Sequence, residues 1–151
     1  MITRRLLSTD RTDAMSQAGV ASLRIIAGIL VATLHGWHKV VEGWQYATTG
    51  ADWPLVHDTV ALGFPIPVAF AALAALSQFA GGWLLAAGAG TRIAAFLVAS
   101  TMATALMLNL RTGGPDAQLA GMYALVSASF VLIGGGRWSV DQLLSRNGRS
   151  R

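Results

Sequence analysis

Residues 67–87 decide the fold, and they read PVAFAALAALSQFAGGWLLAA. From Val68 onward the only polar side chains in this stretch are Ser77 and Gln78. A helix rises about 1.5 Å per residue, so the stretch covers roughly 30 Å, the thickness of a bilayer's hydrocarbon core. Backbone N–H and C=O groups find no water there, so such a run must be helical. The sequence therefore predicts a membrane-spanning helix at this position.

Three similar apolar runs complete the pattern, each closed by Gly, Pro or charge. A soluble helical bundle is the alternative, but its helices would each keep a polar face, which residues 67–87 lack. Hydrophobic residues make up 54% of the 151 residues and charged residues 12%, about half the charge of an ordinary soluble domain. We predict an all-α fold, a transmembrane four-helix bundle, with spans at about residues 20–41, 67–87, 93–110 and 119–133.

The remaining segments are expected to be short or to lie at the membrane surface. Residues 1–19 are predicted to be a polar tail, 20–136 the membrane domain and 137–151 a basic tail. The first span is expected to end at Glu42-Gly43. The connection 44–66 is too long for a simple turn and is expected to fold back as a short helix or a cap. A capping box at Ser139–Gln142 predicts a short C-terminal interfacial helix through about Ser145.

Charge placement predicts the orientation of the chain. With four spans, both termini and the link at residues 88–92 lie on one side of the membrane. That side would hold Arg4, Arg5, Arg11, Arg24, Arg92, Arg137, Arg146, Arg149 and Arg151, while the other holds only Lys39 and Arg111. The positive-inside rule then puts both termini in the cytoplasm. The chain is expected to cross the membrane several times. The net charge of +4 forms no single patch, so nucleic acid is not an expected partner.

The residues available restrict cofactors. The chain has no cysteine, which excludes thiol–disulfide exchange and iron–sulfur ligation by the chain itself. His35 and His38 could meet one metal on a helix, but no further ligand within a span completes the site. A haem held between helices has the same difficulty. We therefore expect no metal and no redox cofactor held by this chain alone. A site shared within an oligomer stays open, and a quinone is one ligand that the chain could bind.

The first span carries an unusual row of ionisable residues. Arg24, His35, Lys39 and Glu42 fall on one helical face, with His38 at its edge. Ionisable groups at membrane depth usually face the bundle or a cleft, so all five are candidates for ligand binding. The simpler interpretation makes Lys39 and Glu42 an interfacial ion pair and His35 a packed, hydrogen-bonded core residue.

Two further polar residues and three glycines complete the candidate set. Gln78 and Asn109 are predicted either to bond across helices or to line one pocket with His35 and bind a polar head such as a quinone carbonyl. Gly28, Gly81 and Gly82 are predicted to pack helices closely, because small residues let membrane helices approach one another.

Several ordered motifs resemble the DoxX family over about residues 21–143. They are Leu23-Arg24 with Gly28, His35-Gly36 with Lys39, Gly63-Phe64-Pro65 with Pro67, Gln78 with Gly81-Gly82, Gly88 with Gly90-Thr91-Arg92, and Gly134–Arg137 with Ser139-Val140-Asp141. The resemblance implies a four-helix bacterial inner-membrane protein. The family takes its name from subunits of a thiosulfate:quinone oxidoreductase, and some members work with redox partners. Two positions that are usually acidic in the family are Gln78 and Gln118 here, which argues against a proton-transfer role carried by those carboxylates.

Two functions follow as hypotheses, and a small transporter ranks third because no broken helix or inverted repeat is evident. The first is a membrane subunit of a quinone-linked redox assembly, which anchors a partner or contributes to a quinone pocket. The second is a non-catalytic assembly subunit that packs Gly81/Gly82 or alanine faces against a larger membrane complex. Beyond the lipid bilayer, a protein partner or a second copy of the chain is expected in either case.

Overall fold

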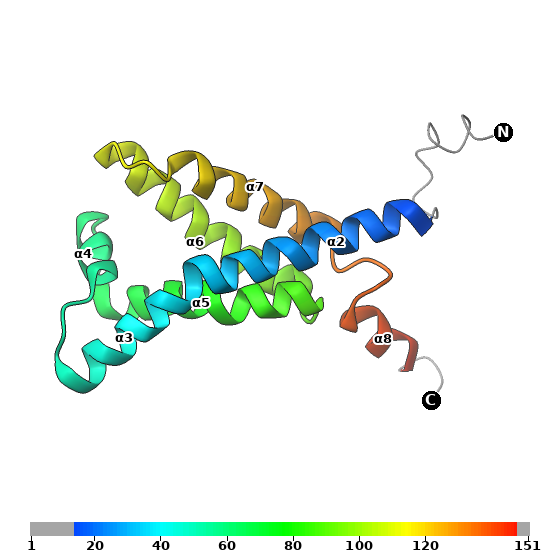
Figure 1. Ribbon diagram of the computed structural model, residues 1–151, viewed down its shortest axis with the longest axis horizontal. Coiled ribbons are helices and arrows are strands. Elements are labelled where there is room, and N and C mark those ends of the chain that lie inside the picture. Colours follow the sequence, from blue (N-terminus) through cyan, green and yellow to red (C-terminus); the bar gives the residue numbers. More distant parts are fainter. Residues whose placement is uncertain (1–13, 148–151) are drawn as a thin grey trace.

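A computed structural model describes residues 14–147, and all regular structure in that range is helical. Predictions about residues 1–13 and 148–151 lie outside the described residues. Figure 1 shows the arrangement. The elements are α2 (Ala14–Leu30), the π-helix η1 (Val31–Gly36), α3 (Trp37–Thr49), α4 (Pro54–Ala61), α5 (Pro67–Ala87), α6 (Thr91–Thr112), α7 (Ala117–Ile133) and α8 (Val140–Asn147).

The long helices have the length and composition to cross a bilayer. The continuous helix Ala14–Thr49 has 36 residues, α5 has 21 and α6 has 22, and each contains an apolar window long enough to span. The shorter apolar helix α7 has 17 residues, at the lower end of the range of about 17–25 that spans require. The prediction of an all-α helical bundle is confirmed, and the chain is a multi-pass membrane protein.

The helix that contains the first span runs further than Glu42-Gly43, where the span is predicted to end. It continues through α3 to Thr49 and ends where Gly50 takes a φ of 71°, so the end of its membrane-embedded part stays a prediction. Gly43 serves a close contact: a Cβ built there would lie 2.8 Å from the ring of Trp53. The 36-residue helix is about 54 Å long at 1.5 Å per residue, so its outer end extends beyond a hydrocarbon core of about 30 Å.

Glycine contacts hold the first helix against α5. A Cβ at Gly28 would lie 2.6 Å from the backbone of Gly82 and Ala86, and a Cβ at Gly82 would lie 2.8 Å from the backbone of Gly28 and Ala32. Gly36 meets the backbone of α5 in the same way. Gly81, in contrast, faces α6, where a Cβ would come 3.3 Å from Val98. Gly28 and Gly82 therefore pack inside this chain and are not free to pack against a partner's span.

The two ends of the bundle differ in their covering elements. The start of α2, the α5–α6 turn and α8 lie at one end, which we call the α8 end, while α3, α4 and the α6–α7 turn lie at the other, the α4 end (Figure 1). The connection at residues 50–66 contains α4, which packs on α5 through buried Trp53 and Ala71. The long connection thus folds back onto the α4 end of the bundle.

Candidate functional site

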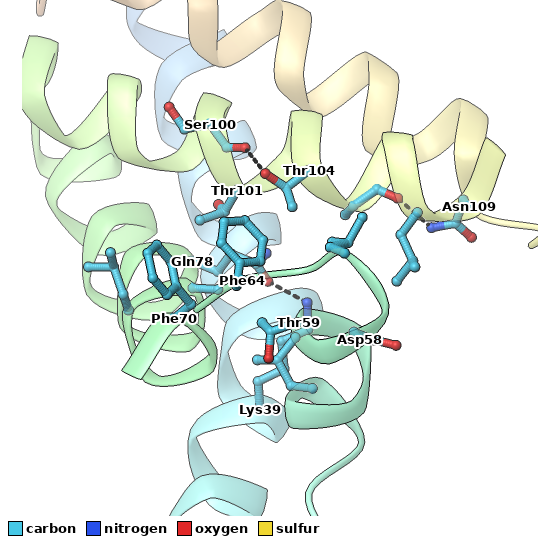
Figure 2. A pocket seen from close by; sticks show the side chains of 16 residues that line it. Lys39, Asp58, Thr59, Phe64, Phe70, Gln78, Ser100, Thr101, Thr104 and Asn109 are labelled. Carbon is cyan, nitrogen blue, oxygen red and sulfur yellow. Dashed lines mark hydrogen bonds between the residues drawn. The ribbon is translucent and has the colours of Figure 1, made fainter. Parts of the chain in front are cut away.

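A pocket of about 330 Å³ lies between α3, α4, α5 and α6 (Figure 2). Such a volume is at the lower end of the range for small-molecule sites, about 300–1,000 Å³. Its apolar walls include two phenylalanines and several leucines, while its polar groups come from all four helices. The residues that carry the argument below are Lys39, Asp58, Thr59, Phe64, Phe70, Leu73, Gln78, Ser100, Thr101, Thr104 and Asn109.

Lys39 and Gln78 form the polar contact at the centre of this pocket. Lys39 Nζ donates a hydrogen bond to Gln78 Oε1 over 2.8 Å, and the Gln78 side chain belongs to a residue only 2% exposed. An ammonium group has three N–H donors, and Gln78 is the hydrogen-bond partner found for Lys39 among residues 14–147. Lysines near a membrane surface usually extend toward the headgroups. Here the ammonium points instead to the middle of α5, with donors left for a ligand.

Three further polar groups of the pocket are already bonded to the backbone. Thr59 donates to the carbonyls of Val56 and Pro67, and Thr101 donates to carbonyls of its own helix. The Asn109 amide donates to Ala105 O over 2.9 Å. These three donors are used, whereas the Lys39 ammonium keeps donors for a ligand.

The pocket follows the outer half of the helices toward the α4 end. Gln78 and Ser100 lie near the middles of α5 and α6, whereas Asn109 lies near the end of α6 and Asp58 lies on α4. The nine residues from Ser100 to Asn109 correspond to about 13 Å along the helix. A molecule in this pocket would therefore reach from mid-membrane depth to the surface layer.

Three of the predicted site residues line this pocket and four do not. Lys39, Gln78 and Asn109 line it, whereas His35 lies against α7, where its ring meets Tyr123 edge-on with centroids 5.1 Å apart. His38 is exposed and Glu42 is half-buried, and neither lines the pocket. The structure therefore does not place His35 with Gln78 and Asn109.

The π-helix η1 explains why the predicted row of residues is divided. The Trp37 N–H bonds to Ala32 O, a spacing of five residues. Since a π turn takes in one more residue than an α turn, faces before and after it are offset by about 100° relative to a regular helix. His35 within η1 thus faces α7, while Lys39 after it faces α5.

Sequence reasoning missed the pocket residues supplied by the long connection and by α6. Asp58, Thr59 and Phe64 reach the pocket only because α4 folds back over α5. The length of the 44–66 segment and its two prolines were the available signals, and they do not indicate which side chains turn inward. Thr101 and Thr104 were visible as polar residues in a span, but only packing decides which pocket they face.

Arg24 lies at the α8 end, away from this pocket. The residue is 1% exposed, and its Nη1 donates to Leu85 O over 2.6 Å and to Ala86 O over 2.7 Å. Its Nη2 donates to Trp138 O over 2.9 Å. The last carbonyls of a helix have no partner within that helix, so Arg24 caps the C-terminus of α5 and fastens the segment before α8.

Asp141 of α8 performs the matching task at the start of α6. Its carboxylate accepts hydrogen bonds from the N–H groups of Gly90 and Thr91 at 2.7 and 2.9 Å and from the Thr91 hydroxyl at 2.7 Å. Burial alone would raise the pKa of the Asp141 carboxyl, but these hydrogen bonds and the charge of Arg24 outweigh it and hold the pKa below its usual range. Arg24 and Asp141 together therefore fasten α8 and the segment before it to the turn between α5 and α6.

The DoxX family profile matches residues 19–111, which is more than half of the chain. The chain belongs to the DoxX family. No curated protein and no solved structure gives a significant match. The DoxX match extends from α2 almost to the end of α6 and includes every residue of the pocket, while α7 and α8 lie beyond it.

Metal binding has no obvious place in the described part of this DoxX protein. Residues 14–147 contain no group of three or more His, Asp or Glu side chains positioned to hold a metal ion. His57 Nε2 instead meets Asp52 Oδ1 at 2.7 Å on the exposed surface near α4. Exposed pairs of this kind contribute little to stability.

Replacing Asp141 by Asn should destabilise this DoxX protein and change its response to acid. Asparagine keeps one side-chain oxygen but loses the charge and the second acceptor, and a hydrogen bond to a charged group contributes about 1.5–3 kcal/mol. Because the folded pKa of Asp141 is depressed, its stabilising contribution is complete above the ordinary carboxyl pKa and is lost as pH falls through the folded value. Thermal unfolding followed by circular dichroism in detergent, at neutral pH and in acid, measures both effects.

The matched control is Asp116→Asn. Asp116 occupies the N-cap of α7 but makes no side-chain capping hydrogen bond, so this change should leave the melting temperature nearly unaltered. Equal effects of the two substitutions, or an acid-induced loss of stability that is unchanged in Asp141→Asn, would contradict the role assigned to Asp141.

Proposed function

We propose that this DoxX protein is a membrane subunit of a quinone-linked redox assembly and that it contributes a quinone-binding pocket. The observation that carries the proposal is the Lys39 ammonium, bonded to the neutral Gln78 amide and facing a pocket with aromatic and aliphatic walls. A quinone carries carbonyl oxygens that accept hydrogen bonds from such donors, and its apolar ring suits walls formed by Phe64 and Phe70.

Gln78 matters for this proposal because it is not a carboxylate. A glutamate at that position would pair directly with the lysine and neutralise it. An amide accepts the hydrogen bond but leaves the positive charge of Lys39 available. Asp58 also lines the pocket, so the site holds one positive and one negative charge. This suits a neutral head group that accepts hydrogen bonds as a quinone and donates them as a quinol.

Access from the bilayer supports a lipid-soluble ligand. Leu73 of α5 is 52% exposed and Ser100 of α6 is exposed, although both line the pocket. The wall between α5 and α6 is therefore not sealed, and a quinone dissolved in the membrane would enter from the side. The chain has no cysteine to hold an iron–sulfur cluster, so electrons would reach the quinone from a partner protein.

The alternative proposal is a non-catalytic assembly subunit of a larger membrane complex. A groove of about 670 Å³ along α6 and α7, lined by residues such as Ala99, Ala103 and Gly121, favours it. Gly82 already packs against the first helix. In this alternative the partner would therefore bind the faces of α6 and α7 and not the glycines. Bulky substitutions at Ala103 should then release the partner and leave the Lys39 pocket unaffected.

The test uses the fact that Lys39 is the only lysine in the chain. The protein, purified in mild detergent, is extracted for bound quinone and then treated with an amine-reactive reagent, with and without a short-chain ubiquinone. Mass spectrometry separates modification of Lys39 from that of the N-terminus. We expect quinone to protect Lys39, whereas an alkylbenzene without carbonyl oxygens should not. An absence of extracted quinone combined with equal labelling under all conditions would reject the quinone pocket.

The orientation in the bacterial inner membrane forms part of this proposal. The α8 end carries Arg92, Arg137 and Arg146, so the positive-inside rule places it in the cytoplasm and the pocket toward the periplasm. A C-terminal fusion to alkaline phosphatase should be inactive, and an insertion of the same enzyme after Gly50 should be active. A cysteine at Thr49 should react with an impermeant reagent in intact spheroplasts. An active C-terminal fusion would reverse the orientation and the side to which the pocket opens.

A further inference from the structure

A second polar site lies on the other side of the first helix, between η1 and α7. His35 Nε2 and Ser127 Oγ are both buried and have no hydrogen-bond partner among residues 14–147. Ser127 is 1% exposed, and His35 is half-buried with its ring edge-on to Tyr123. Tyr123 and Ser127 are four residues apart on α7, so they lie on one face of that helix. Tyr123 therefore links the two residues, because its ring contacts His35 and it shares a helix face with Ser127.

Ser127 differs from several other hydroxyls of the spans. A serine or threonine within a helix usually donates back to the carbonyl four residues earlier. Thr33, Thr104 and Ser129 do so, at 2.8–2.9 Å. Ser127 makes no such bond, although the same arrangement is open to it. Its hydroxyl is left free at a buried position, where an unmade hydrogen bond is costly.

The π-helix η1, which contains His35, gives a second, independent indication of a functional site here. η1 contains His35 and replaces regular α-helical hydrogen bonding over Val31–Gly36. Segments of π-helix inside α-helices are frequent at functional sites. Here the irregular backbone, an imidazole nitrogen and a serine hydroxyl occur together at an interface that is otherwise apolar, formed by Val31, Val98 and Met102.

We propose that His35 Nε2 and Ser127 Oγ bind water in an internal hydration site between η1 and α7. Water both donates and accepts, so it satisfies an imidazole nitrogen in either tautomer together with a hydroxyl, and buried waters typically make two to four hydrogen bonds. Val31 and Val98 carry no donor atom and Met102 carries only a soft thioether, and residues 14–147 contain no group of His, Asp or Glu side chains that would complete a metal site around His35. This site is separate from the Lys39 pocket, and the inference does not depend on quinone binding.

Hydroxyl-radical footprinting by X-ray radiolysis of the purified protein tests the site, because radicals formed from a bound water modify the side chains beside it. Tyr123 and buried Met102 pack in the same cluster and serve as reporters. Phe130, equally buried but in an apolar cluster with Leu85, is the dry reference. We expect Tyr123 and Met102 to be modified several-fold faster than Phe130, and Ser127→Ala to remove most of that difference.

Thermal unfolding gives a second readout that does not depend on radiolysis. If water satisfies the Ser127 hydroxyl, Ser127→Ala removes a hydrogen bond and lowers the melting temperature. If the hydroxyl has no partner at all, the same change removes a buried unsatisfied group and raises it. Ser129→Ala is the matched control on the same helix, exposed and bonded to Leu125 O. Modification of Tyr123 as slow as that of Phe130, or a higher melting temperature for Ser127→Ala, would overturn the proposal.

Discussion

Replacing Lys39 by Met should weaken quinone binding by about tenfold to a hundredfold. A hydrogen bond from a charged donor contributes about 1.5–3 kcal/mol, and each 1.4 kcal/mol corresponds to a factor of about ten in affinity. Methionine keeps the length and apolar stem of lysine, so the walls of the pocket should stay in place. Titration of the purified protein with a short-chain ubiquinone, followed by calorimetry in detergent, measures the change in dissociation constant.

Arg111→Met provides the control for charge. Arg111 lies at the same end of the bundle, is exposed and does not line the pocket, so its replacement should leave quinone affinity unaltered. The melting temperature of Lys39→Met should also be measured, because the change leaves the buried Gln78 carbonyl without its donor. A folded Lys39→Met protein that binds quinone as tightly as the wild type would remove the basis of the proposed function.

Adding one methyl group at Gly28 or Gly82 should destabilise the protein strongly. The added Cβ would lie 2.6 Å from backbone atoms at Gly28 and 2.8 Å at Gly82, and backbone cannot move aside as a flexible side chain can. Overpacking of this kind costs about 1–3 kcal/mol, occasionally more. Unfolding of Gly28→Ala and Gly82→Ala in mixed micelles with increasing SDS, followed by circular dichroism, measures the loss.

The matched control is Gly19→Ala on the same first helix. No atom lies within 4 Å of a Cβ built at Gly19, so alanine should be neutral or stabilise the helix by roughly 0.5–1 kcal/mol through its higher helix propensity. The expected result is a clear loss of stability at Gly28 and no loss at Gly19. Equal small effects at all three glycines would show that α2 and α5 do not pack as closely as described.

The helices could be predicted from sequence because the bilayer dictates them. Residues 67–87 have no arrangement in hydrocarbon other than a helix, and α5 has those bounds. The end of the first helix could not be predicted, because Gly43 has two compatible roles, as a helix terminus or as a contact surface. Only the position of Trp53, fixed by the fold of the connection, decides between them.

The candidate site was predictable only in part, for a different reason. Lys39, Gln78 and Asn109 could be chosen because polar groups in a span need partners. Arg24 satisfies the same reasoning, yet its partners are backbone carbonyls, which no sequence pattern indicates. Assigning His35 to the same face as Lys39 assumed a regular helix, and η1 departs from it.

The extra residue taken up in η1 also sets the relative rotation of the two halves of the first helix. If η1 became regular α-helix with the same number of residues, everything after it would turn by about 100° about the helix axis. Arg24 would keep its place against the end of α5, while Lys39 would be carried away from Gln78. The backbone form of this one segment therefore couples the closed end of the protein to the geometry of its pocket. Deleting one residue within η1 should make the helix regular and keep Lys39 beside Gln78, whereas deleting one residue from the regular turns between Arg24 and η1 should turn Lys39 away and weaken ligand binding.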